Sequence, residues 1–375
     1  MMGKVIPLKE NLNTTIKEIL ELLLEKECFD AVLVPVRVPS GESFAYLLIK
    51  DRRILQSCTP LPPIMPVQGA RALRDLTRRG NSNLKVLCVM RPCEIRASIE
   101  LAKLRQIRLE NVSFLSFDCP GALRTKDYIN SPEESDNQYQ EIIATWESEN
   151  FRSACNTCLH FSYEGLPADL HIHLTNMKEE RMGITPLSDK GKESLSRIGI
   201  ECNGDLSGWQ TEVNEISRKR IANRDKAFSE LRDKISGAEG FHDFFSDCIN
   251  CHNCMRVCPI CYCRQCFFDV SGEAKSEAED YLAKIGAKGG IRFPGDMMLF
   301  HLGRMSHMAL SCVSCGSCED GCPMEVPVSR AFAFVADEVQ KMFDYVPGRN
   351  EEEPIPVQTY QEDELHQYED AKGTG

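Results

Sequence analysis

The stretch that decides the organisation of this chain reads Cys248-Ile-Asn-Cys251-His-Asn-Cys254-Met-Arg-Val-Cys258-Pro259. It is repeated as Cys312-Val-Ser-Cys315-Gly-Ser-Cys318-Glu-Asp-Gly-Cys322-Pro323. Each copy has the C-x2-C-x2-C-x3-C-P spacing that is typical of 4Fe-4S cluster ligands. Thiolates two residues apart can follow a tight turn around three corners of one cubane, whereas the longer step carries the fourth sulfur away. The two copies therefore predict a module with two iron–sulfur clusters.

The ligands of the two clusters follow from this spacing. In proteins with two such runs, the fourth cysteine of each run ligates the cluster of the other run. Cluster one is expected to bind Cys248, Cys251, Cys254 and Cys322. Cluster two is expected to bind Cys312, Cys315, Cys318 and Cys258. Zinc is the alternative, but zinc sites normally use two separated pairs of ligands, so the pattern favours iron–sulfur.

The composition agrees with a metal-binding protein. The chain has 375 residues, and 44 Lys and Arg against 56 Asp and Glu give a net charge of −12, which argues against nucleic-acid binding. No apolar run approaches the roughly 18 residues of a membrane span, and the start of the chain lacks the pattern of a secretory signal. The 19 cysteines are clustered in a long chain, unlike those of short secreted disulfide proteins. We therefore expect a cytoplasmic protein.

Residues 1–175 are expected to form an α/β domain. Short apolar runs rich in β-branched or aromatic residues predict strands at 29–36, 44–49, 84–90 and 112–117. Apolar residues at helical spacing predict helices at 13–28 and 95–104. The order of strand, helix and strand from 84 to 117 is that of a βαβ unit, which predicts a parallel pair of strands.

Three segments are expected to follow the α/β domain. Residues 176–246 are heavily charged and predict a helical connection. Residues 247–347 form the dicluster domain, which we expect to be mostly α-helical because 53 residues, including a helical pattern at 293–310, separate Cys258 from Cys312. Residues 348–375 form an acidic tail, which is either disordered or bound to a partner, or only aids solubility.

Three cysteines lie outside the two runs, directly after the first. They are Cys261, Cys263 and Cys266. They could bind another metal, or they could pack beside the clusters as small hydrophobic residues, as free cysteines often do. The sequence leaves both interpretations open.

Further cysteines occur in the α/β domain in a distinctive order. Met90-Arg-Pro-Cys93-Glu-Ile opens a predicted helix, Cys119 ends the next predicted strand, and Cys155-Asn-Thr-Cys158 and Ala168-Asp-Leu follow. This order resembles that of the beta subunits of coenzyme F420-reducing hydrogenases and related formate dehydrogenases. Members of that family carry a G-T-P-C-Q-I helix start, a strand ending in Cys, a C-x-x-C pair and an A-D-I strand. The resemblance covers residues 80–175 well and the part of the chain before residue 80 only loosely.

The resemblance implies a flavoprotein that binds FAD and passes electrons between iron–sulfur clusters and a two-electron carrier. It places Cys93, Cys119, Cys155 and Cys158 at the cysteine positions of the family. These four could converge on a third 4Fe-4S cluster; alternatively, Cys93 and Cys119 are buried core thiols. FAD rests on the resemblance alone, because the chain has no Gly-x-Gly-x-x-Gly turn.

The chain also departs from the family pattern. Its dicluster module follows the α/β domain, whereas family members usually place it first. Met90-Arg91 replaces the Gly-Thr of the family, and Glu94 replaces the Gln. Charged side chains therefore stand where small polar ones are usual, which affects specificity for a deazaflavin.

These features predict an electron-transfer subunit of an anaerobic oxidoreductase complex, of formate dehydrogenase or hydrogenase beta-subunit type. The alternative is a flavin-free electron relay that resembles the C-type subunit of heterodisulfide reductase. The expected partners are other subunits of a formate dehydrogenase, hydrogenase or heterodisulfide reductase type of complex. The eight histidines are scattered and suggest no catalytic arrangement, and we expect His171 and His173, on one strand face, to be solvent-facing or structural.

Overall fold

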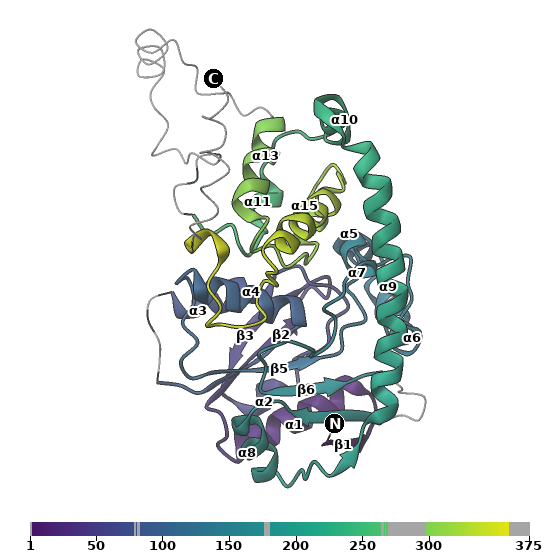
Figure 1. The fold of residues 1–375 in the computed structure, drawn as a ribbon. Coiled ribbons are helices and arrows are strands. Elements are labelled where there is room, and N and C mark those ends of the chain that lie inside the picture. The colour runs from purple at the N-terminus through teal and green to yellow at the C-terminus, as the bar shows by residue number, and fades with distance from the viewer. Residues whose placement is uncertain are drawn as a thin grey trace.

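A single eight-stranded sheet lies at the centre of the N-terminal part of the chain, with helices on both faces (Figure 1). The computed structural model describes residues 2–78, 80, 83–175, 181–263, 266, 268 and 297–359, which hold the elements named below. The strands are β1 Met2–Pro7, β2 Ala31–Arg37, β3 Phe44–Ile49, β4 Val86–Val89, β5 Val112–Phe117, β6 Leu170–His173, β7 Arg181–Pro186 and β8 Gly204–Asp205. Their order across the sheet is β3-β2-β4-β5-β6-β7-β1-β8. Residues 360–375 of the expected tail and the start of the expected 293–310 helix lie outside the described residues.

The middle of the sheet is parallel and its edges are antiparallel. Strands β2, β4, β5 and β6 pair in parallel, and β3, β7, β1 and β8 add antiparallel pairs. Every position of β4 is buried, because its Val-Leu-Cys-Val sequence is apolar on both faces. The four predicted strands are confirmed as β2 to β5. The predicted βαβ unit is also confirmed, as β4, helix α4 (Pro92–Lys103) and β5.

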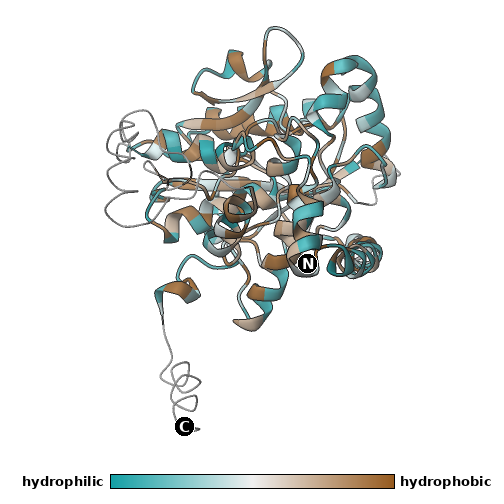
Figure 2. Cartoon of the chain, turned by 90° about the horizontal axis from the view of Figure 1, so that it is seen from above, coloured by the Kyte–Doolittle hydropathy of each residue, from teal (hydrophilic) through white to brown (hydrophobic). Residues whose placement is uncertain are grey.

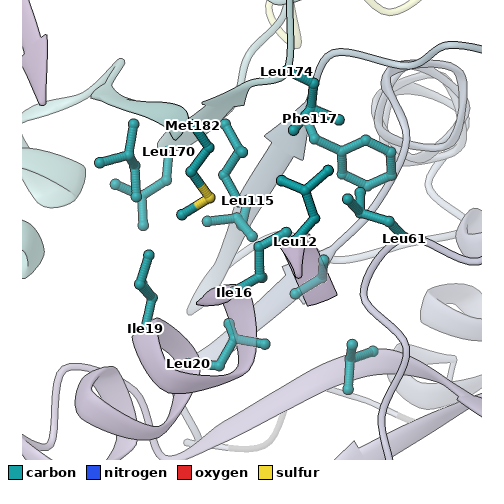
Figure 3. Packing of buried hydrophobic residues seen from close by; sticks show 14 of the residues in the cluster. Leu12, Ile16, Ile19, Leu20, Leu61, Leu115, Phe117, Leu170, Leu174 and Met182 are labelled. Carbon is teal, nitrogen blue, oxygen red and sulfur yellow. The ribbon is translucent and has the colours of Figure 1, made fainter. Parts of the chain in front are cut away.

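One face of the sheet is covered by helix α1 (Leu12–Glu25), which confirms the helix predicted there. Asn11 begins it, because its side chain accepts a hydrogen bond from the Thr14 amide. The buried face of α1, which includes Ile16 and Leu20, packs against Leu115 of β5 and its neighbours (Figure 3). This packing removes the apolar side of α1 from water and fixes the helix on the sheet.

The other face carries α4 and helix α3 (Gly69–Thr77), and the cysteine-rich module packs beyond them (Figure 1). The remaining helices that precede this module are α2 Arg52–Leu55, α5 Thr125–Asn130, α6 Pro132–Thr145, α7 Ser153–Asn156, α8 Asp189–Arg197, α9 Ser207–Lys234 and α10 Gly237–Phe244. Hydrophilic residues gather on outward helix faces and hydrophobic residues on the interior strands (Figure 2).

The segment expected as a charged connection, residues 176–246, contains several elements. Its long charged helix is α9, which spans 28 residues. The segment also supplies β7 and β8, which pair with β1 on opposite sides. The sheet therefore extends beyond residue 175.

The cysteine-rich module, residues 247–347, consists in its described residues of four helices and the loops between them. The helices are α11 Asn253–Arg256, α13 Met297–Met308, α14 Ser317–Asp320 and α15 Val328–Met342. The 3-10 turn Pro356–Gln358 follows in the expected tail, whose described residues 348–359 pack on the fold through buried Ile355, so the disordered interpretation is wrong for this part. Buried polar contacts join this module to the sheet domain. Arg152 Nη2 donates to Asp320 Oδ2 at 2.7 Å, and Arg96 Nε donates to the Pro347 carbonyl at 2.8 Å. The cysteines of the two parts are therefore held in a fixed relation.

Candidate iron–sulfur centres

The two cysteine runs fold into matching loops. In each run the residue before and the residue after the second cysteine have left-handed backbone conformations: Asn250 and His252 in the first, Ser314 and Gly316 in the second. A four-residue helix, α11 or α14, begins directly afterwards. These positive φ angles curl the chain so that successive cysteines turn toward a common centre. The repeated motif is therefore also a repeated backbone shape.

The predicted ligands of cluster one come together. Cys248 and Cys251 lie in the loop, Cys254 lies in α11, and Cys322 arrives from the end of α14. Burial raises the pKa of the Cys254 thiol to about 11, and the other three thiols are close enough to add to that shift. The structure thus brings Cys322 to the first run, as the exchange of fourth cysteines predicts, while iron ligation itself stays a prediction.

The predicted ligands of cluster two also come together. Cys258, Cys312, Cys315 and Cys318 line one cavity. Burial raises the pKa of the Cys312 thiol to about 12, and Cys258 is the next cause of the rise. Four thiols that face one cavity are the donor set that a 4Fe-4S cluster uses, so the chemistry of this set fits such a cluster.

The four cysteines of the α/β domain converge as well. Cys93 opens α4 after β4, Cys119 follows β5, and Cys155 and Cys158 lie in and just after α7. All four line a single cavity. They meet because the parallel strands β4 and β5 end at the same edge of the sheet. They are half-buried and face that cavity, which favours a third ligand set over the alternative of core thiols.

Backbone and side-chain donors surround the third set. Arg91 Nη1 donates to Cys119 Sγ at 2.9 Å, and the Ala122 amide donates to Cys155 Sγ at 3.3 Å. Burial raises the pKa of the Cys155 thiol to about 11, with Cys119 as the next cause. Hydrogen bonds to ligand sulfurs are among the factors that set cluster potentials. The surroundings therefore suit thiolate ligands.

The three sets of thiols lie in series. Ser314 and Cys315 line both the cavity of cluster two and the cavity of the third set. Arg304 of α13 lies between the ligand sets predicted for clusters one and two; it is 2% exposed and donates to Cys254 Sγ at 3.0 Å. Cys258 and Cys318 of cluster two are also among the groups that act on Arg304 electrostatically.

The sequence did not single out Arg304. The signal available in the sequence was an arginine within a helical pattern rich in methionine, because a charge among apolar side chains needs an anionic partner. Its partners, the thiols near α11, lie about 50 residues earlier in the chain. Only the fold could show that they face each other.

A further cavity adjoins the third set on the side of β2 and β3. Met65 and Arg91 line both cavities. Glu94, which is buried, accepts hydrogen bonds from the Tyr46 hydroxyl at 2.9 Å and from the Gly69 amide at 2.6 Å. The free space is only 10 Å³, room for about one water. The side chains as they stand therefore do not enclose a flavin ring.

His171 and His173 lie in the core, so the solvent-facing interpretation is wrong and the structural one holds. His171 Nε2 lies 2.9 Å from Asp118 Oδ1, and His173 Nε2 lies 2.7 Å from Thr185 Oγ1. Burial opposes the charge of Asp118, but His171, together with His173 and Ser162, outweighs burial and lowers the pKa of that carboxyl to about 2. Trp209 of α9 closes the site by donating to Asp118 Oδ2 at 2.6 Å. This network fixes the backbone next to Cys119.

Comparison with known proteins agrees with the class of protein that these sites define, an iron–sulfur protein. Residues 244–326 match the family described as a 4Fe-4S dicluster domain. The chain thus carries an iron–sulfur dicluster domain behind an α/β domain. Among the described helices, none is long and apolar enough to cross a membrane.

Two of the proteins similar to this chain are beta subunits of formate dehydrogenases. The chain is 23% identical over 304 residues to the F420-dependent formate dehydrogenase subunit beta of Methanocaldococcus jannaschii, covering 70% of this chain and 74% of the relative. It is 29% identical over 316 residues to the F420-dependent formate dehydrogenase 1 subunit beta of Methanococcus maripaludis, covering 72% and 74%. The resemblance predicted from the cysteine order is therefore confirmed.

One solved structure is also similar. It is a chain of the F420-reducing NiFe hydrogenase complex from Methanosarcina barkeri, studied by xenon derivatisation. The sequence identity is 13% and the TM-score is 0.45, over 60% of this chain and 86% of that chain.

Proposed function

We propose that this chain is the electron-transfer subunit of an oxidoreductase complex of the formate dehydrogenase or hydrogenase beta-subunit type. The observation that carries the proposal is the serial placement of three thiol sets. The cavity of cluster two and the cavity of the third set share Cys315 as a lining residue, and the thiols of clusters one and two both act on Arg304. When bound, 4Fe-4S clusters supply one-electron steps. The chain holds the thiols in order from the α/β domain to the outer end of the dicluster domain.

The assignment of ligands forms part of this proposal. Cluster one takes Cys248, Cys251, Cys254 and Cys322, and cluster two takes Cys312, Cys315, Cys318 and Cys258. A third cluster takes Cys93, Cys119, Cys155 and Cys158. We also infer that the dicluster domain is mostly α-helical, because its described residues outside the cysteine loops lie largely in α13 and α15. The expected partners are the other subunits of such a complex, and the expected location is the cytoplasm.

Flavin binding has weaker support. The family resemblance implies FAD, but the cavity beside the third set offers 10 Å³. Flavin binding therefore rests on the family resemblance alone, and the flavin-free electron relay is the second candidate function.

The decisive experiment is to purify the protein without oxygen and to measure iron, zinc, acid-labile sulfide and released flavin per chain. About 12 irons with one flavin are expected for three clusters and a flavoprotein. About 12 irons without flavin would support the relay. About 8 irons would contradict the assignment of a third cluster, and zinc in place of iron would contradict the whole proposal.

A further inference from the structure

Three cysteines outside the three ligand sets meet at one cavity of the dicluster domain. Cys261, Cys263 and Cys266 all line a space of 490 Å³ between the first cysteine run and α13. That volume equals roughly sixteen waters at about 30 Å³ each. The three thiols therefore face an open space, which is not how small core residues pack.

The described side chains around these thiols add further sulfur. Cys261 Sγ lies 3.1 Å from the Met308 thioether sulfur, and Cys266 Sγ lies 3.6 Å from that of Met255. Both methionines line the same cavity. A thiol and a thioether form only weak hydrogen bonds. Hydrogen bonding therefore gives little reason for so many sulfur atoms to gather.

The sequence places the three thiols at spacings that metal sites use. Cys263-x2-Cys266 repeats the two-residue step of the cluster loops, and Cys261 precedes it by two positions. Cys261 and Cys266 lie within electrostatic reach of each other. Arg304 lines the same cavity and brings a positive charge that would offset the charge of thiolates.

We propose that Cys261, Cys263 and Cys266 form a further metal centre that takes a soft metal. Thiolate and thioether ligands select zinc, copper(I) or iron in a sulfide cluster over hard cations. The cavity is far larger than one ion needs, which favours a polynuclear iron–sulfide centre with one side open to the cavity. A single zinc ion is the other soft metal that the same thiolate ligands would bind.

The first test uses the unaltered chain. Cys263 is exposed, so its thiol should react at once with iodoacetamide if it is free. We expect anaerobically purified protein to show Cys263 and Cys266 protected in peptide mass spectra, and labelled only after a chelator removes the metal. Immediate labelling of Cys263 in the metal-loaded chain would overturn the proposal.

The second test measures the metal that the site holds. Cys263→Ser and Cys266→Ser are preferable to a change at Cys261, because Cys261 contacts Cys258 of cluster two. Each variant should lose three or four irons with matching sulfide for a cluster, or one zinc for a single ion. Cys202→Ser, at a half-buried thiol beside β7, is the matched control and should lose none. Unchanged metal in both variants would refute the site.

These measurements separate this inference from the proposed function. An iron–sulfide centre at Cys261, Cys263 and Cys266 would add three or four irons to the roughly 12 expected for the three clusters, and the absence of the third cluster would remove about four, so the total count does not separate the two proposals. The difference in iron between wild type and the Cys263 and Cys266 variants does separate them, because it does not depend on the third cluster. A variant that loses about eight irons would indicate collapse of the dicluster. In that case, the iodoacetamide labelling of the unaltered chain would decide whether Cys263 and Cys266 bind a metal.

Discussion

Arg304 should set the reduction potential of cluster one. Its guanidinium is 2% exposed, donates to Cys254 Sγ at 3.0 Å and to the Cys254 carbonyl at 3.2 Å, and lies over the Phe332 ring at 4.6 Å. Burial opposes its charge, but Cys254 and the neighbouring thiols outweigh that effect and raise the pKa of Arg304. The cation therefore persists beside the thiols at any pH at which the protein is folded.

The magnitude follows from Coulomb's law. A unit charge roughly 6 Å from an added electron interacts with it by about 3 kcal/mol at an effective dielectric constant of about 20. At about 2.3 kcal/mol per 100 mV, this equals roughly 130 mV. A positive charge stabilises the reduced cluster, so Arg304→Gln should lower the midpoint potential by roughly 100 mV. Arg304→Lys keeps the charge and should restore part of the difference.

The assay is a redox titration of the whole chain followed by electron paramagnetic resonance. Arg330→Gln is the matched control, because Arg330 is an exposed arginine of the same domain and solvent screens its charge. The control should leave the potential of cluster one unchanged. If Arg304→Gln leaves the potential unchanged or raises it, with iron content intact, the assigned role of Arg304 is wrong.

Three further predictions concern the ligands and the stability of the fold. Cys155→Ser should remove about four irons, whereas Cys58→Ser, a buried thiol outside the ligand sets, should remove none; iron analysis checks both. Glu100→Ala should lower the free energy of unfolding by roughly 2–4 kcal/mol, because buried Glu100 accepts from the Tyr345 hydroxyl at 2.6 Å; denaturant midpoints measure this. Burial lowers the pKa of His173 to about 3, so the folded chain holds it neutral. The unfolded chain binds that proton below about pH 6.5, so stability should fall from pH 6.5 toward 3, and His173→Gln should flatten this loss; a stability profile that is equally steep in the variant would contradict the assignment.

The sequence was most informative where local spacing decides the structure. The strands at 44–49 and 112–117 match β3 and β5 residue for residue. The cysteine loops were equally predictable, since their ligand spacing constrains the backbone within each run. Strand β1 was not predicted, because its Met-Gly-Lys-Val-Ile-Pro sequence is mostly exposed and its partner β7 is distant along the chain. Pairing over that distance leaves no periodic signal.

The buried polar groups were harder to predict. Alternation along β6 shows that His171 and His173 share a face, but it cannot show which face is covered. The cover is Trp209 of α9, which contacts His173 with ring centroids 4.3 Å apart. A charged helix such as α9 gives no sign in its sequence that one tryptophan closes a site on a distant strand.

The contact between the two parts of the chain matters most for function and was the least visible in the sequence. Cys315 can border the third set only because the dicluster domain is docked on α7, where the buried side chains of Arg152 and Asp320 form an ion pair at 2.7 Å across 168 residues of sequence. The Thr125 amide and hydroxyl also donate to the same Asp320 carboxylate. A break in this contact would leave each ligand set intact while separating the third set from cluster two. The proposed relay therefore depends on the docking of the two parts as much as on the cysteines themselves.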